Sequence, residues 1–364
     1  MRKIVILIIP LILVNILTAV NIDIDGVLRT RAAVYNDLAE STDGHIDNRL
    51  RLGMSTELAP GLNFRTRLQF GNVTWGDAAT GGSINSAVKI SAYELYLEYL
   101  VYSIDARIRF GQQCWADPLG LIIDGSFSGI MLSTNELIGF KAELGFIKVL
   151  EVDDFDHDGN YFLANISSSF PIPWGILTSA YYQPSINNDS YTLMPYLDMS
   201  LAPLRVRAAA FMGAHINNPN PTDIGLGTAI KSTADLGAFK IGADILFATK
   251  NGIATLFPYY KNGLYIYGIG HYNDSVNLYW KTPYSDNTDN TISTVGSITV
   301  PVTRSSNVFC AAGYLSKQGY EVNVGFDHDL IPSKMKVAGY AAAGVNEDTD
   351  ITNYVMGIAV VVPF

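Results

Sequence analysis

Arginine pairs separated by one residue are the most distinctive chemical feature of this sequence. Ten of the twelve arginines form five such pairs: Arg29 and Arg31, Arg49 and Arg51, Arg65 and Arg67, Arg107 and Arg109, and Arg205 and Arg207. Residues i and i+2 of a β-strand point to the same face of the sheet. Both guanidinium groups of each pair should therefore face one way, where their summed field would attract anions.

The other face of the same stretches is apolar. It carries Leu50, Leu52, Phe64, Leu68, Ile108 and Phe110. A soluble, secreted β-protein could bury such a face in its core. The same pattern also fits a membrane barrel with lipid outside and water inside.

Composition favours the barrel. Of 364 residues, only 16% are charged, against about 25% in typical soluble domains. The sequence is also rich in tyrosine (21) and glycine (32), and its net charge of −10 does not suit a nucleic-acid binder. No apolar run of eighteen residues occurs, so a membrane-spanning form would have to be a closed barrel.

The first nineteen residues resemble a secretory signal peptide. Arg2 and Lys3 precede an apolar run that contains Pro10, and Ala19 offers a small residue for cleavage. A membrane-anchor helix is the alternative, but the run falls short of the roughly 20 residues that a span needs. We therefore expect a signal peptide at 1–19 and one barrel domain at 20–364.

Short turns alternate with longer polar loops along the chain. We expect short turns at 59–61, 102–103, 171–174, 202–203, 237 and 331–333, and longer loops at 36–45, 76–87, 151–159, 216–223, 282–294 and 346–352. Strands are expected at 47–58, 63–75 and 89–99, the last with Glu94, Tyr96 and Glu98 on one face and Tyr93 and Leu95 on the other. This rhythm predicts an all-β, transmembrane antiparallel up-and-down β-barrel of about 18 strands, with 16 to 20 admissible.

The last strand alternates most regularly. Every second residue from Tyr354 to Phe364 is apolar, and the residues between them are mostly small. This strand resembles the assembly signal of bacterial outer-membrane barrels. The resemblance implies a bacterial outer-membrane location, with outer-membrane lipid, lipopolysaccharide and the barrel assembly machinery as partners.

A narrower resemblance covers residues 48 to about 132. The motifs that begin at Arg49 (RLRLG), Leu68 (LQFG), Glu94 (ELYL) and Phe110 (FGQQ) are similar to the first half of the alginate-export porins. That family implies eighteen strands and an arginine-lined pore that carries an anionic polysaccharide. The sequence departs from the family at Gln112, where an arginine is usual.

These observations predict a porin for passive passage of small anionic or saccharide-like solutes. The expected pore-lining residues are the ten paired arginines together with Glu94 and Glu98. In a structural alternative, Glu94, Glu98 and Asp105 merely pair with the arginines and fix the wall. Functional alternatives are an export channel for an anionic polysaccharide, or a barrel-borne adhesin or enzyme.

No motif predicts catalysis, a cofactor or a metal. Residues 153–158 resemble the start of a calcium loop, but the twelfth position is Asn165 rather than glutamate. Cys114 and Cys310 are too few to form a disulfide framework. Residues 114–136 are the least strand-like part of the first half; they either fold inward and narrow the pore or form an external loop.

Overall fold

The computed structural model describes residues 21–36, 42–135, 139–151, 158–170, 172–183, 188–217, 223–270, 289–349 and 351–364. The predicted signal peptide at 1–19 lies outside these residues. Within them no helix is long and apolar enough to cross a membrane.

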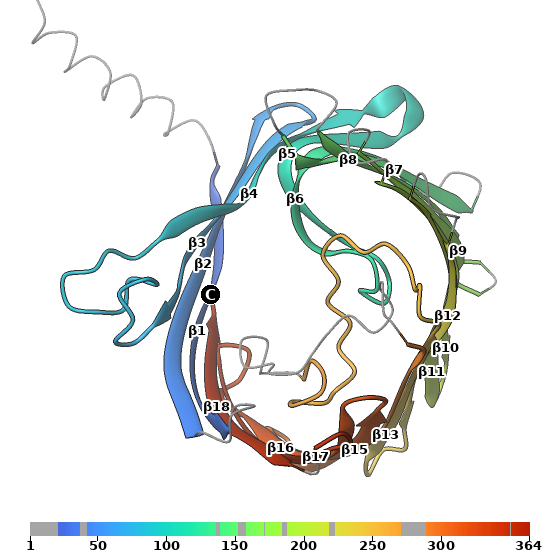
Figure 1. Ribbon diagram of the computed structural model, residues 1–364. Coiled ribbons are helices and arrows are strands. Elements are labelled where there is room, and N and C mark those ends of the chain that lie inside the picture. The colour runs from blue at the N-terminus through green and yellow to red at the C-terminus, as the bar shows by residue number, and fades with distance from the viewer. Residues whose placement is uncertain are drawn as a thin grey trace, which may run out of the picture.

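Eighteen antiparallel strands close into one barrel (Figure 1). The expected fold class and strand number are thus confirmed. The strands are β1 (Asp23–Asn36), β2 (Thr42–Ala59), β3 (Leu62–Thr74), β4 (Ile90–Val101), β5 (Ala106–Ala116), β6 (Asp124–Thr134), β7 (Phe140–Leu150), β8 (Gly159–Ser168), β9 (Trp174–Tyr182), β10 (Asn188–Leu201), β11 (Leu204–Asn217), β12 (Asp223–Asp235), β13 (Lys240–Ala248), β14 (Thr291–Thr303), β15 (Ser306–Leu315), β16 (Gly319–Ile331), β17 (Met335–Asn346) and β18 (Thr352–Pro363).

Each strand pairs with its neighbours in sequence, and β1 also pairs with β18. Closure leaves no free sheet edge, which a spanning sheet requires because lipid offers no hydrogen-bond partners. The β4–β5 turn contains a three-residue 3-10 helix, η1 (Tyr102–Ile104). The bounds of two expected loops differ from the prediction: the loop at 36–45 is shorter, and the loop at 282–294 ends earlier but belongs to a longer connection that follows Ala248. Asn36 already pairs with Thr42, and β14 begins at Thr291, because the ladder hydrogen bonds continue into these polar residues.

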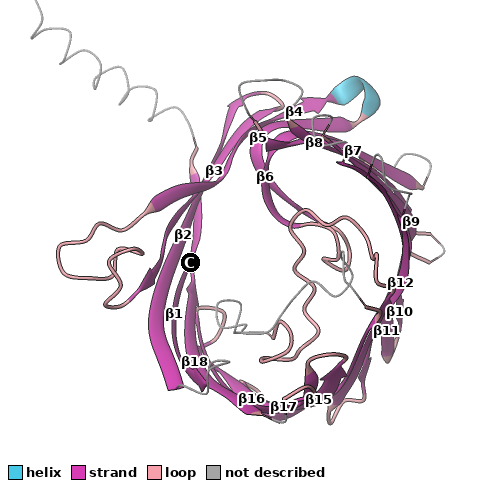
Figure 2. Cartoon of the chain, in the orientation of Figure 1, coloured by secondary structure: helices cyan, strands magenta, loops and turns pink. Residues whose placement is uncertain are grey.

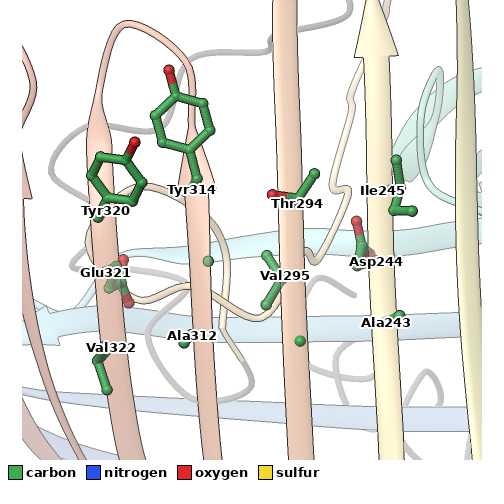
Figure 3. Close-up of a pocket in the computed structure, with 12 residues that line it drawn as sticks. Ala243, Asp244, Ile245, Thr294, Val295, Ala312, Tyr314, Tyr320, Glu321 and Val322 are labelled. Atoms are coloured by element: carbon green, nitrogen blue, oxygen red, sulfur yellow. The ribbon is translucent and has the colours of Figure 1, made fainter.

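The two faces of the sheet differ as the alternation predicts. On β16, Glu321 is 1% exposed, while its neighbours Tyr320 and Val322 are 65% and 55% exposed. Figure 3 shows these residues with the adjacent strands β13 to β15. Glu321 hydrogen-bonds to chain segments inside the ring of strands, so its face is the interior and that of Val322 is the exterior.

Two connections fold into the barrel rather than away from it. They are residues 117–123, between β5 and β6, and the described part of the long connection after β13, residues 249–270 (Figure 2, pink). Side chains of both segments are buried against interior-facing side chains of the wall, in two apolar clusters. Of the two interpretations of residues 114–136, inward folding is thus correct for 117–123. The residues on either side of 117–123 belong to β5 and β6.

Candidate solute pathway inside the barrel

Four of the five arginine pairs lie on adjacent or nearly adjacent strands. They belong to β1, β2, β3 and β5, and β4 between them supplies Glu94 and Glu98. In the register, Arg29 lies opposite Arg49, and Arg67 lies opposite Glu94. All share the face of Ala33, which packs against the inward segment 264–267. We call this interior surface of β1 to β5 the arginine wall.

A buried ion cluster occupies the end of the arginine wall near the β1–β2 connection. The Asp47 carboxylate accepts hydrogen bonds from the Arg31 guanidinium, with an Nη2 to Oδ2 distance of 2.9 Å. Arg29 lies 3.9 Å from Asp47, and the His45 Nε2 lies 3.3 Å from it. Arg31 and Asp47 are almost completely buried. Arg31 and Asp47 therefore form a buried, fixed ion pair at this end of the wall.

Two carboxylates bridge the middle pair of arginines. Asp25 lies 3.2 Å from Arg65 and 3.0 Å from Arg67. Glu94 lies 2.9 Å from Arg65 and 3.6 Å from Arg67. The four charges alternate across β1, β3 and β4, so each guanidinium group is oriented by two carboxylates and still faces the interior.

The remaining arginines of the wall differ in their partners. Arg109 pairs with Glu98 at 3.1 Å. Arg51 donates to the Gln69 side chain at 2.8 Å and lies 3.7 Å from the centre of the Tyr93 ring. The expected orientation of Tyr93 is therefore wrong. A register shift beside Leu68 turns Tyr93 to the arginine side.

Arginines exceed their described partners on this wall. Three described carboxylates, those of Asp25, Glu94 and Glu98, lie within 4 Å of members of a set of five arginines: Arg51, Arg65, Arg67, Arg107 and Arg109. Among the described residues, no carboxylate lies within 4 Å of Arg51 or Arg107. The structural alternative, in which carboxylates merely pair with the arginines, is thus correct for part of the arginine wall. An excess of positive charge remains on it. Asp105 instead accepts a hydrogen bond from Asn135.

The fifth pair lies elsewhere. Arg205 and Arg207 are on β11, and Arg205 pairs with Asp198 at 2.8 Å near the short β10–β11 turn. Arg207 donates to the main-chain oxygen of Pro118, at the start of the first inward segment. The structure therefore does not bring this pair into the arginine wall.

The inward segment 117–123 is held by one carboxylate. Asp117 accepts four main-chain hydrogen bonds, from Leu119 at 3.0 Å, Leu121 at 3.2 Å, Ile122 at 2.7 Å and Ile123 at 3.0 Å. Burial raises the pKa of the Asp117 carboxyl above its usual value, and the four N–H groups oppose that rise. Three of these apolar side chains are completely or almost completely buried, so the segment is fixed by packing as well as by hydrogen bonds.

The second inward segment is held in the same way from the wall. The Glu321 carboxylate accepts from the main-chain N–H groups of Tyr265 at 2.6 Å, Ile266 at 2.9 Å and Tyr267 at 3.0 Å. Asn262 closes the segment on itself, because its side-chain oxygen accepts from Leu264 and Ile269. Neither Asp117 nor Glu321 was singled out from the sequence, where a lone acid carries no sign of such a role.

Exposure to solvent inside the barrel is uneven. The side chains of Arg65, Arg67 and Arg109 remain 29%, 26% and 28% exposed. Interior-facing residues of other strands are buried beneath the inward segments, among them Ile147, Leu177, Met194, Leu246 and Val355. Water inside the barrel therefore meets the arginine wall, the exposed surfaces of the inward segments and the open part of the opposite wall near Thr233 and Ser297.

Candidate metal ligands and cysteines complete the chemistry of the part of the chain that the structure describes. It contains no cluster of three or more His, Cys, Asp or Glu side chains able to hold a metal ion. Of the calcium-like stretch at 153–158, Asp158 alone is described, and it forms an ion pair with Lys148. Cys114 and Cys310 are both free thiols.

Solved structures of other proteins share this architecture. No protein-family model and no curated protein matches the chain. Solved structures do match: a BenF-like porin from Pseudomonas fluorescens Pf-5 (TM-score 0.65, 9% identity) and, from Pseudomonas aeruginosa, OpdF with glucuronate (0.64, 10%) and OpdK with vanillate (0.63, 10%). Each alignment covers 94% of this chain and 98% of the other.

The fold is that of an outer-membrane porin. It supports the predicted location in the bacterial outer membrane, where the short turns of such barrels face the periplasm. Because the sequence identities are near 10%, the similarity to these structures shows the fold alone. These structures do not support the resemblance to alginate-export porins, which stays a prediction from the sequence.

Proposed function

We propose that this barrel is a passive outer-membrane channel for small anionic or saccharide-like solutes. The observation that carries the proposal is the arginine wall itself: the side chains of Arg65 and Arg67 remain 29% and 26% exposed inside the barrel, although carboxylates lie beside them. A solute that crosses the barrel would meet an excess of guanidinium groups. Such groups bind carboxylates and similar anions through charge-assisted hydrogen bonds.

The predicted pore-lining residues would have unequal roles. Arg51, Arg65, Arg67, Arg107 and Arg109 would attract the solute, and Glu94 and Glu98 would orient the arginines beside them. Arg29, Arg31 and Arg49 lie toward the buried end of the wall. Arg205 and Arg207 would act on β11, away from this wall.

Related structures give the proposal independent support. OpdF and OpdK were crystallised with glucuronate and vanillate, both small carboxylates. The similar structures are porins, which favours a channel over a barrel-borne enzyme or adhesin. Export of an anionic polysaccharide remains the alternative, but inward segments that occupy part of the interior favour small solutes. Outer-membrane lipid, lipopolysaccharide and the barrel assembly machinery are the proposed partners.

Ion selectivity in a planar bilayer tests this function. The wild-type channel should prefer chloride over potassium in a KCl gradient, although the whole protein is acidic. Fixed charges at the pathway outweigh charges farther away than the Debye length of about 8 Å at physiological salt. The double variant Arg65→Ser/Arg67→Ser should shift the reversal potential toward cations, and the shift should shrink at high salt.

A matched control is available outside the barrel interior. Arg304 is exposed in the β14–β15 turn, so Arg304→Ser should leave the reversal potential unchanged. A wild-type channel that already prefers cations would mean that the arginines serve only to pair with carboxylates, and the proposed function would be wrong.

A further inference from the structure

A separate charged cavity lies away from the arginine wall. It has a volume of about 480 Å³ and lies between residues 261–270 of the second inward segment and the interior face of β11 to β16. Small-molecule sites usually have volumes of about 300–1,000 Å³. The cavity is therefore large enough for a small solute.

Three cations from three elements line this cavity: Arg207 of β11, Lys231 of β12 and Lys261 of the inward segment. Lys231 is already engaged. Its ammonium group lies 3.6 Å from Asp244, and 3.9 Å from the centre of the Tyr260 ring. Lys231 and Asp244 thus neutralise one another and help to seat the segment.

The other two cations are less engaged. Among the described residues, no carboxylate lies within 4 Å of Arg207 or Lys261. Arg207 donates to the Pro118 oxygen at 3.3 Å, and Lys261 lies 5.0 Å from the centre of the Tyr259 ring. At longer range, Asp244 attracts Arg207 and Asp124 attracts Lys261. The second carboxylate of the lining, Asp327, has its own partner in Lys336 at 3.5 Å. The cavity therefore has an excess of positive charge.

Hydroxyl groups line the part of the cavity nearer the short turns. Thr233, Ser297 and Thr299 all lie on the interior-facing positions of their strands. None of the three hydroxyls hydrogen-bonds to another described residue. The aromatic rings of Tyr265 and Phe309, which are stacked 6.4 Å apart, supply an apolar surface beside them.

We propose that this cavity is a second solute-binding site and that its ligand class is a small hydroxylated carboxylate, such as a sugar acid. The carboxylate would bind between Arg207 and Lys261, and the hydroxyl groups of the ligand would bind Thr233, Ser297 and Thr299. This inference rests on the proposed channel function, because the ligand must enter the barrel to reach the cavity. It assigns to β11–β16 a recognition step distinct from attraction by the arginine wall.

Single-channel recording with sodium gluconate as the probe tests the site. Gluconate should interrupt the wild-type current in a saturable manner. Sodium hexanoate has the same charge and six carbons but lacks the additional hydroxyls, so it should block more weakly. Lys261→Gln should raise the half-blocking concentration of gluconate about tenfold or more, because a hydrogen bond to a charged group contributes roughly 1.5–3 kcal/mol.

Further variants separate the parts of the site. Ser297→Ala/Thr299→Val should weaken block by gluconate and leave block by hexanoate unchanged, because only gluconate has hydroxyls for these positions. Arg304→Gln in the exposed turn is the matched control and should behave as wild type. Heat-modifiable migration on gels verifies that each variant is folded.

Two results would overturn the inference. One is unchanged gluconate block in folded Lys261→Gln; the other is equal block by gluconate and hexanoate in the wild type. Failure of the proposed function appears in a different measurement, the reversal potential in KCl without gluconate. The two failures are therefore distinguishable.

Discussion

Replacing Asp117 by asparagine probes how firmly the first inward segment is held. The carboxylate has two oxygens, and each accepts two main-chain N–H groups. Asparagine keeps one oxygen and replaces the other with an NH2 group, which cannot accept a hydrogen bond. Two main-chain N–H groups would then be buried without an acceptor.

The expected cost follows from these contacts. Each buried group left without its partner costs about 1–3 kcal/mol. A neutral amide is cheaper to bury than a carboxylate, which places the loss for two groups near the lower end, at about 2–3 kcal/mol. Burial of Leu119, Leu121, Ile122 and Ile123 contributes about 1.5–3 kcal/mol each, or roughly 6–12 kcal/mol together. Packing therefore outweighs the loss, and the segment should stay seated most of the time.

Single-channel recording distinguishes these states. Mean conductance of Asp117→Asn should stay close to that of the wild type. Brief excursions to higher current should become about 30-fold more frequent, which corresponds to about 2 kcal/mol. Asp124→Asn is a matched control, because the Asp124 carboxylate accepts no hydrogen bond from the described residues. If excursions in Asp117→Asn are as rare as in the wild type, the hydrogen-bond argument is wrong. If the mean conductance is permanently higher, packing does not outweigh the lost hydrogen bonds.

Three further predictions concern the barrel wall. Asp25→Asn removes a carboxylate that contacts both Arg65 and Arg67, so the reversal potential should move further toward anions; an unchanged potential would contradict the excess-charge argument. Leu97→Arg places a charge on the outer face, where it should cost about 2–4 kcal/mol near the midplane, measured by urea unfolding in lipid. Phe364→Asp should impair assembly, because every second residue of the last strand is apolar. Normal heat-modifiable migration of that variant would count against it.

The strands were predictable because each arginine pair lies on a stretch whose alternate residues are apolar. A period of two in the apolar residues identifies each stretch as a strand and shows which of its faces is apolar. The predicted orientation of Tyr93 was wrong for a local reason. An irregularity in the β3–β4 ladder beside Leu68 adds one residue to β4, and no turn residue marks it in the sequence.

The partners of the arginines were harder to predict. Glu94 and Glu98 were foreseen, but Asp47 meets Arg31 only through the register of β1 and β2, and Asp25 reaches Arg65 and Arg67 across β2. The inward segments have neither strand nor helix periodicity. Their contacts join distant parts of the chain: Glu321 binds residues 54 to 56 positions earlier.

Both carboxylates that hold the inward segments bind main-chain N–H groups, which every residue except proline provides. The identity of the side chains on these segments is therefore largely independent of the hydrogen bonds that seat them. Apolar positions tolerate exchange for residues of similar volume, and exposed positions such as Lys261 are freer still. In the proposed channel, point substitutions in these two short segments would be enough to change which solutes it prefers. Diversification of its cargo would then require no change in the eighteen strands.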